Sequence, residues 1–350
     1  MDELCERLAA RTLELCRVQS PTGEERALCD ELERWASRLG RGPVRRVGNA
    51  LVVGTFRAPA VALVGHLDTV PFFEGDGAPS REGDRIRGKG ASDMKGGVAV
   101  ALALFEDLPP TGPLSPILVL YDREEGPYAE NGLEPLFATG VLPRVDLAIC
   151  LEPTANALQL GCVGSLHATL RFRGRSAHSA RPWEGANAIH AAGPLLSRLG
   201  SLAPAEVEKD GLVYREVFSV TRAAGGRARN VVPDLFEVNL NYRFAPGKSL
   251  EEAQADVRDV VGEGAAIEFT DLSPSAPPCL GNPLVQRLRP STRGVAPKQA
   301  WTDVARFAVH GIDAVNFGPG DPAQAHQVGE WASVQHLGEC YRALRLLFGG

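Results

Sequence analysis

Long apolar runs and an excess of basic residues are both absent from this sequence. The longest apolar run, 97–105, is far shorter than the roughly 20 residues that a membrane-spanning helix needs. The formal net charge is −6, so no positive field attracts nucleic acid or anionic lipid. The first residues are acidic, where a secretory signal would be basic. We therefore expect a cytoplasmic protein that binds neither membranes nor nucleic acid.

Paired cysteines are absent too. The seven cysteines are an odd number, and none is spaced as a CxxC pair. In a chain of 350 residues this favours small buried side chains over a disulfide framework or a structural zinc site. There is no internal repeat or low-complexity tract, and the length allows roughly two globular domains.

The first 164 residues alternate predicted strands and helices. Helices are expected over 3–19 and from a capping box at Thr22–Glu25 to Gly40. Apolar runs of strand length end in acidic or imidazole side chains at 61–66, 117–121 and 145–151. The alternation predicts an α/β fold with a mostly parallel central sheet covered by helices, in which ligands bind at the carboxyl ends of the strands.

From Ser165 the pattern becomes one of half-buried antiparallel strands, at 166–173, 213–221 and 235–244. A second capping box joins Ser249 and Glu252, and the proline-rich segment 273–278 is typical of a linker. We therefore expect a catalytic domain of residues 1–164 and 273–350, interrupted by an inserted α+β domain of residues 165–272.

His66 and Asp68 close the apolar run 61–66 and lie two positions apart. The period of two in a strand points both side chains the same way. A ligating histidine normally donates its other ring N–H to a carboxylate or carbonyl group, so His66 is a candidate metal ligand and Asp68 its partner. The pair alone is equally compatible with a strand end and a turn closed by Pro71.

Further candidate ligands follow other predicted strands or lie in loops. Two metal ions that share one bridging carboxylate need five groups, and mixed imidazole and carboxylate ligands suit Zn²⁺. Glu124 would then remain free to take a proton from water, although adjacent glutamates are also common in solvated turns. The five candidate ligands are His66, Asp93, Glu125, Glu152 and His326.

Four motifs carry a resemblance to a known family: GHLDTVP (65–71), GKGASDMKGG (88–97), EEG (124–126) and LEP (151–153). Their order and spacing resemble the co-catalytic dinuclear zinc aminoacylase and carboxypeptidase family, which includes acetylornithine deacetylase, carboxypeptidase G and succinyl-diaminopimelate desuccinylase. The resemblance covers nearly the whole chain. Within the family, the actinobacterial desuccinylase branch is most similar, on segments 131–133, 177–183, 211–216, 238–246, 301–307 and 316–326.

The resemblance implies two zinc ions per subunit, with Co²⁺ or Mn²⁺ as alternatives. Asp93 would bridge the two ions. His66 and Glu152 would complete one site, and Glu125 and His326 would complete the other. It also implies a catalytic domain of the zinc-peptidase type, with the inserted domain serving as a lid and dimer interface.

The resemblance implies catalytic roles as well. Glu124 would be the general base that moves a proton from a metal-bound water to the leaving amine, and Asp68 would hold His66. In this family the smaller domain of a homodimer lends a histidine to the neighbouring subunit. His178 matches that position and would stabilise the oxyanion, the alternative being an ordinary loop histidine.

Substrate-binding positions are matched by Asn230, Arg243, Arg181 and Gly320. Arg243 would hold a substrate carboxylate through two hydrogen bonds, and a surface arginine is the alternative. One segment departs from the pattern: residues 161–165 read GCVGS, where the proteobacterial branch has an arginine before the Gly-Ser. A contact from that segment to the substrate carboxylate is therefore open.

The resemblance implies a small-molecule reaction, the hydrolysis of N-succinyl-LL-2,6-diaminopimelate to succinate and LL-2,6-diaminopimelate, on the way to lysine and cell-wall peptide. Acetylornithine deacetylation or another amidohydrolase or carboxypeptidase reaction on the same scaffold is the alternative. A catalytically inactive binding protein is the alternative from a different class.

Overall fold

The computed structural model describes residues 2–109 and 111–349. The chain forms two compact units. The first comprises Met1–Gly161, Pro278–Lys298 and Thr302–Gly350, and the second comprises Cys162–Pro277 and Gln299–Trp301. Within the described ranges, no helix combines the length and the apolar character that a membrane span requires.

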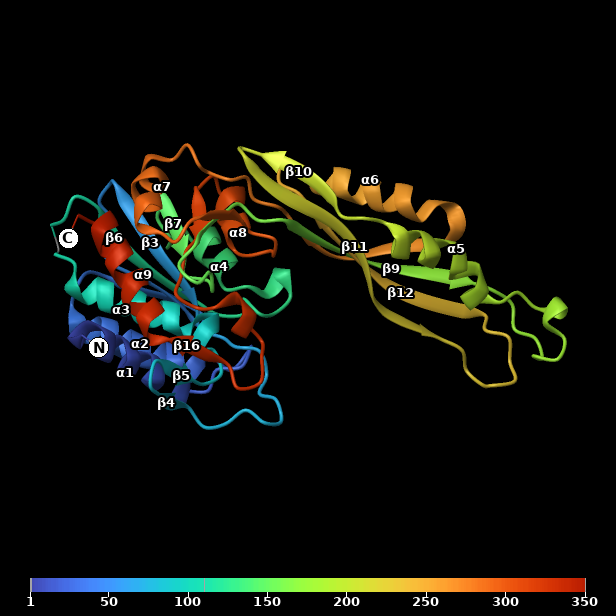
Figure 1. Cartoon of the computed structure of the whole chain (residues 1–350), viewed down its shortest axis with the longest axis horizontal. Coiled ribbons are helices and arrows are strands. Elements are labelled where there is room, and N and C mark those ends of the chain that lie inside the picture. Colours follow the sequence, from blue (N-terminus) through green and yellow to red (C-terminus); the bar gives the residue numbers. More distant parts are fainter. Residues whose placement is uncertain (1, 110, 350) are drawn as a thin grey trace. The chain divides into compact units, whose positions relative to one another are not determined.

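The first unit is built around an eight-stranded sheet (Figure 1). The four central strands run parallel, as expected from the alternating pattern, and β3 is buried along its whole length between two parallel neighbours. In spatial order the strands are β1 (Val44–Val47), β2 (Ala50–Val53), β6 (Ser115–Tyr121), β3 (Ala60–His66), β7 (Leu147–Cys150), β15 (Ala314–Asn316), β8 (Leu158–Leu160) and β14 (Val295–Pro297). A smaller antiparallel sheet contains β16 (Trp331–Ser333), β5 (Arg85–Arg87) and β4 (Ser80–Glu82).

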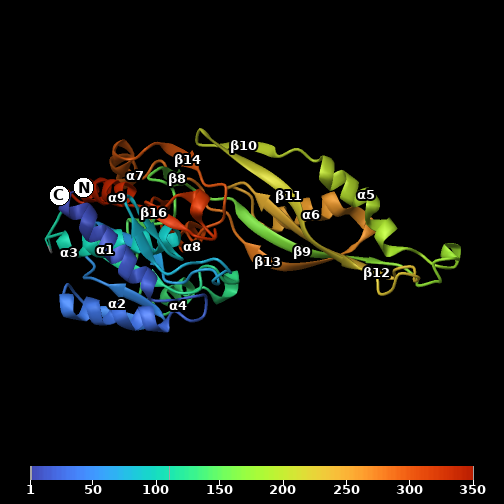
Figure 2. The same ribbon diagram turned by 60° about the horizontal axis from the view of Figure 1, so that its bottom comes forward.

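Three long helices of the first unit pack against one another: α1 (Glu3–Arg17), α3 (Gly96–Asp107) and α9 (Val334–Leu347) (Figure 2). Helix α3 is buried from Gly96 to Phe105, because its sequence is apolar on every side. The unit also contains α2 (Arg26–Leu39), α4 (Leu133–Ala138), α7 (Pro283–Leu288) and α8 (Val304–Val309). None of the seven cysteines, all of which lie in the described ranges, forms a disulfide, and only Cys279 is not fully buried, as expected from their spacing.

The capping box predicted at Thr22–Glu25 is wrong. Helix α2 begins at Arg26, and no side chain caps its first turn. The Thr22 hydroxyl donates instead to Asp68 Oδ2 at 3.0 Å, and Glu25 Oε1 accepts the Gly23 N–H at 2.6 Å. Thr22 bonds to Asp68, which is distant in sequence, and not to Glu25, because Thr22 lies beside the end of β3.

The second unit is a five-stranded antiparallel sheet with two helices on one face (Figure 1). Alternate residues of the central strands form the core under these helices, and the capping box at Ser249 and Glu252 is present as predicted. In spatial order the strands are β10 (Ala205–Lys209), β11 (Leu212–Gly225), β12 (Leu235–Phe244), β9 (Gly164–Arg173) and β13 (Ala266–Ser273), and the helices are α5 (Ala188–Ser201) and α6 (Leu250–Val261).

Candidate metal centre

His66 ends β3 at the carboxyl edge of the large sheet, where its side chain is 1% exposed. Its Nδ1 lies 3.0 Å from the backbone oxygen of Asp68 and 3.5 Å from Asp68 Oδ1. Its Nε2 lies 3.1 Å from Asp93 Oδ1. A neutral ring that donates from Nδ1 therefore presents the lone pair of Nε2 toward the Asp93 carboxylate, as a metal ligand would.

The predicted ligands gather into two groups that share Asp93. Ligand atoms of His66, Asp93 and Glu152 lie within 4.8 Å of one another, and so do those of Asp93, Glu125 and His326. His326 Nε2 is 2.9 Å from Glu125 Oε1 and 3.6 Å from Asp93 Oδ2. The structure thus brings together all five side chains, which come from separate strand ends and loops.

Backbone conformation helps to place His326. Its φ is 62°, a left-handed conformation that costs a residue with a Cβ on the order of 1 kcal/mol. Hydrogen bonding to Glu125 raises the pKa of His326 above its ordinary value. Such strain at a side chain aimed into a polar cluster points to a functional role.

Buried negative charge accumulates beside these groups. Burial raises the pKa of Glu152 to about 7, with repulsion from Asp93 as the next cause. Burial also raises the pKa of Glu124 well above its ordinary value, followed by repulsion from Glu152. Burial opposes the charge of His66, but hydrogen bonds to Asp68 and Asp93 outweigh it and raise the pKa of the ring.

A divalent metal ion fits this arrangement. Glu152 is 5% exposed, and its Oε1 has no hydrogen-bond partner among the described residues. A buried carboxylate oxygen without a partner is costly, and a bound cation removes that cost together with the repulsion between the acids. Imidazole and carboxylate ligands suit Zn²⁺ and its neighbours in the first transition row.

Asp68 does more than contact His66. Its two carboxylate oxygens accept the backbone N–H groups of Glu124 and Glu125, each at 3.0 Å, and Oδ2 also accepts the Thr22 hydroxyl. Asp68 therefore fixes the loop that carries the candidate base. The sequence offered no signal for this contact, because it depends on how β3 and β6 pair.

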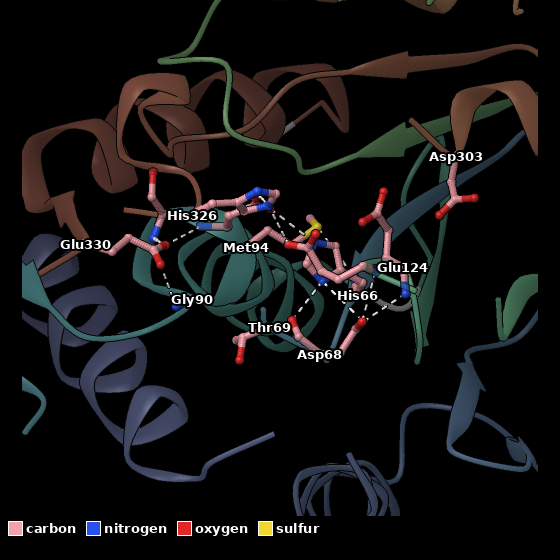
Figure 3. Close-up of polar contacts among 12 residues, drawn as sticks. His66, Asp68, Thr69, Gly90, Met94, Glu124, Asp303, His326 and Glu330 are labelled. Carbon is pink, nitrogen blue, oxygen red and sulfur yellow. Dashed lines mark hydrogen bonds and ion pairs between the residues drawn. The ribbon is translucent and has the colours of Figure 1, made fainter. Parts of the chain in front are cut away.

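Two further acids near the site were not singled out from the sequence. Glu330 is buried beside the loop of Asp93, and burial raises its pKa to about 7. Asp303 accepts hydrogen bonds from Tyr121, Asn131 and Arg306, at 2.6, 2.9 and 2.8 Å respectively. Figure 3 shows Asp303 beyond Glu124 and Glu330 beside Gly90.

Gly320 lies in the first unit, next to the Asp93 turn. A Cβ on Gly320 would be 2.2 Å from the backbone oxygen of Ser92 and 2.9 Å from Pro153 Cβ. Only glycine allows this approach. The Gly-Pro-Gly loop is thereby packed against the segments that carry Asp93 and Glu152.

His178, Asn230 and Arg181 lie together in exposed loops of the second unit. The Ser179 N–H donates to the Asn230 oxygen at 2.9 Å, and the Arg181 N–H donates to the His178 oxygen at 2.8 Å. His178 Nδ1 accepts the Ala180 N–H at 3.0 Å. A neutral His178 ring therefore carries its proton on Nε2, where it is available as a donor.

Arg243 lies on β12 of the second unit and is half-buried. Its Nε donates to Asn241 Oδ1 at 3.1 Å, and burial lowers the pKa of the guanidinium. Among the described residues no carboxylate forms an ion pair with Arg243. Its two terminal nitrogens are therefore available to bind an anionic ligand.

The comparisons with known proteins agree over most of the chain. The model of "Peptidase family M20/M25/M40" matches residues 62–349. A Mycobacterium tuberculosis protein that carries the provisional name of a succinyl-diaminopimelate desuccinylase is 42% identical over 348 residues, 97% of each chain. The succinyl-diaminopimelate desuccinylase of Corynebacterium glutamicum is 37% identical and covers 93% of this chain and 92% of its own length. A tripeptidase from Staphylococcus aureus has a similar fold, with a TM-score of 0.80 at 21% identity and coverage of 98% of this chain and 97% of its own.

Proposed function

The chain belongs to peptidase family M20/M25/M40, and from that premise we propose that it hydrolyses N-succinyl-LL-2,6-diaminopimelate to succinate and LL-2,6-diaminopimelate. The reaction class is supported by a half-buried glutamate, Glu124, which lies within ligand distance of His66 and Glu125, next to the two groups of metal-ligating side chains that share Asp93. One observation carries the choice of substrate: relatives named for this reaction match nearly the whole chain at 42% and 37% identity.

Two divalent ions would be held in the proposed site, Zn²⁺ or alternatively Co²⁺ or Mn²⁺. When bound, they would supply Lewis acidity to the amide carbonyl and to the attacking water. Asp93 would serve both ions, because it belongs to both groups of ligand atoms. His66 and Glu152 would complete one site, and Glu125 and His326 the other.

Glu124 acts as the general base in this proposal. Glu124 accepts a proton from water and then delivers it to the leaving nitrogen; burial, followed by repulsion from Glu152, raises its pKa and so makes it a stronger base. Asp68 holds the backbone N–H of Glu124 and so keeps the base in place. Glu125 is oriented differently, because its side chain pairs with His326.

The second unit would supply the groups that recognise the substrate. Arg243, held through Nε, would offer its two terminal nitrogens to the succinyl carboxylate. Asn230 and Arg181 of the second unit, and Gly320 of the first, would make further contacts. We also propose that the protein is a homodimer in the cytoplasm, in which the Nε2–H of His178 stabilises the oxyanion in the neighbouring subunit's site.

A side-by-side kinetic comparison tests the substrate. The zinc-loaded protein is assayed with N-succinyl-LL-2,6-diaminopimelate and with N-acetylornithine at matched concentrations. We expect kcat/KM to be at least about 100-fold higher for the succinyl compound, because one charge-assisted carboxylate contact is worth roughly 1.5–3 kcal/mol and two hydrogen bonds are made. A preference for the acetyl compound would refute the substrate, and no activity on either would refute both reactions.

A further inference from the structure

Glu330 is a buried acid on the loop that carries His326. It lies four residues after His326 and directly before β16, and it is 2% exposed. It belongs to none of the metal-ligating groups found among the described residues. Its side chain points instead to the backbone of another loop, at Gly90 (Figure 3).

Three backbone N–H groups donate to the Glu330 carboxylate. Oε1 accepts those of Ser92 and Asp93 at 2.8 and 2.9 Å, and Oε2 accepts that of Gly90 at 2.9 Å. Hydrogen bonds to a charged acceptor are about twice as strong as neutral ones. A single side chain therefore accepts three of the four backbone N–H groups of residues 90–93.

The turn over Ala91–Lys95 needs such a partner. Asp93 and Met94 have φ/ψ angles of −122°/92° and −133°/34°, which are not helical, so their backbone groups cannot form a continuous helical ladder. An unsatisfied buried N–H costs roughly 1–3 kcal/mol. Glu330 removes this cost for Ser92 and Asp93, in a turn whose Asp93 carboxylate lies 3.1 Å from His66 Nε2 and 3.6 Å from His326 Nε2.

The same residue ties the two loops together through its backbone. The Glu330 oxygen accepts the Gly88 N–H at 2.9 Å. Beside it, Lys89 Nζ pairs with Asp76 Oδ2 at 2.9 Å and approaches the Gln327 oxygen at 3.4 Å. The contacts of Gly88 and Lys89 therefore also hold the loop of Asp93 to the loop of His326.

We propose that Glu330 is a positioning residue that holds Asp93 in place relative to His326, through its hydrogen bonds to the Gly90, Ser92 and Asp93 amides. This inference rests on the proposed function, because it assigns Glu330 a role in a metal centre. Glu330 belongs to none of the metal-ligating groups among the described residues, and it would act through the shared ligand Asp93. Both metal sites consequently depend on it.

Glu330→Gln is the informative variant. Glutamine preserves shape and volume but replaces one acceptor oxygen by an NH₂ donor, which then faces at least one backbone N–H. We expect the Zn²⁺ dissociation constant, measured by competition with a chromophoric chelator, to rise roughly 10- to 100-fold, as when other partners of metal ligands are removed. The thermal midpoint of the metal-free variant and its circular dichroism are recorded alongside.

Asp146→Asn is the matched control. Asp146 Oδ2 accepts the Ala60 N–H at 2.8 Å, at the opposite end of β3 from His66. This variant replaces one charge-assisted hydrogen bond to a backbone amide by a neutral one, because asparagine keeps an acceptor oxygen, and it does not touch the Asp93 turn. We expect its Zn²⁺ dissociation constant to stay within about 2-fold of the wild-type value, since distant sites act independently.

The outcomes distinguish a failure of the proposed metal centre from a failure of the proposed role of Glu330. If the wild-type protein binds no Zn²⁺, the metal centre itself is refuted. If it binds Zn²⁺ and a folded Glu330→Gln variant binds it equally well, the role of Glu330 is refuted. Should the variant not fold, amide hydrogen exchange of the metal-free wild-type protein decides: slow exchange at Gly90, Ser92 and Asp93 supports the role, and exchange as fast as at exposed amides overturns it.

Discussion

Two adjacent glutamates receive different environments from the same loop. Glu125 forms an ion pair with His326, whereas burial and the nearby Glu152 raise the pKa of Glu124. Asp68 accepts both of their backbone N–H groups, so neither residue is free to exchange places with the other. At the scale of single residues, the ion pair of Glu125 with His326 separates the candidate ligand from the candidate base.

Removing the base carboxylate tests this division. Glu124→Gln should lower kcat by about 100- to 10,000-fold, because general base catalysis contributes that much. The amount of bound Zn²⁺ should not change, since Glu124 is not among the proposed ligands. The measurement is turnover of the zinc-loaded protein together with its metal content. Glu130→Gln, on the same loop but exposed and paired with Arg123, serves as the control, and near-normal turnover in Glu124→Gln would exclude Glu124 as the base.

Arg243 allows a test of substrate recognition at the same scale. Arg243→Lys keeps the charge but loses the planar pair of donors. We expect KM for the succinyl substrate to rise by about 10-fold or more, the equivalent of roughly 1.4 kcal/mol. N-acetylornithine lacks the succinyl carboxylate, so its KM should change less. The exposed Arg222 on β11 provides a control as Arg222→Lys, and an equal change for both substrates would contradict the assignment.

At the scale of elements, close packing between a helix and a strand end determines where Glu152 lies. Helix α3 approaches the residues after β7 so closely that a Cβ on Gly97 would be 2.4 Å from the Leu151 oxygen and 2.8 Å from Leu151 Cβ. Leu151 precedes Glu152. The first turn of α3 therefore restrains a candidate ligand, although no residue of that turn belongs to a metal-ligating group among the described residues.

Gly97→Ala should disturb this packing. The extra methyl must push α3 or residues 151–152 aside, so we expect a loss of about 1–3 kcal/mol in the free energy of unfolding, together with weaker Zn²⁺ binding. Gly193 is the matched control, because it also lies in a helix but has no atom within 4 Å of its built Cβ. Gly193→Ala should be neutral or stabilising by up to about 1 kcal/mol. Urea unfolding of the metal-free proteins measures both, and equal stability of the two variants would refute the packing argument.

At the scale of the whole molecule, the proposed catalytic groups are divided between the two units. The candidate ligands and Glu124 belong to the first unit, while His178, Asn230 and Arg243 belong to the second. His178 and Asn230 are exposed in the single chain. A site shared between subunits would require polar groups that are exposed in the single chain, as His178 and Asn230 are.

Mixed dimers test whether His178 acts in the neighbouring subunit. His178→Ala and Glu124→Ala proteins are each expected to be nearly inactive. After exchange of subunits, up to about a quarter of wild-type activity should return, because half of the dimers are mixed and each of these has one complete site. Mixing Glu124→Ala with Glu124→Gln should restore nothing. No recovery in the first mixture, with subunit exchange shown by mass spectrometry, would refute the shared site.

Much of the fold could be predicted from the sequence. The runs that became β3, β6 and β7 read as buried strands because their apolar residues are continuous, and β12 matches its predicted range of 235–244 because its side chains alternate. The cap at Ser249 was predictable because both partners lie within one turn. The capping box predicted at Thr22 was wrong because the hydrogen-bond partner of Thr22, Asp68, is distant in sequence.

Local pattern and motif order by themselves determined the alternation of strands and helices, the inserted second unit and the five candidate ligands. Only the tertiary structure decided which atoms meet: that Asp93 lies in both groups, that Asp68 holds the backbone of Glu124 and Glu125, and that Glu330 holds the turn of Asp93. These contacts join segments far apart in the chain. They depend on strand order, loop conformation and the close approach allowed by glycine, none of which a local pattern encodes.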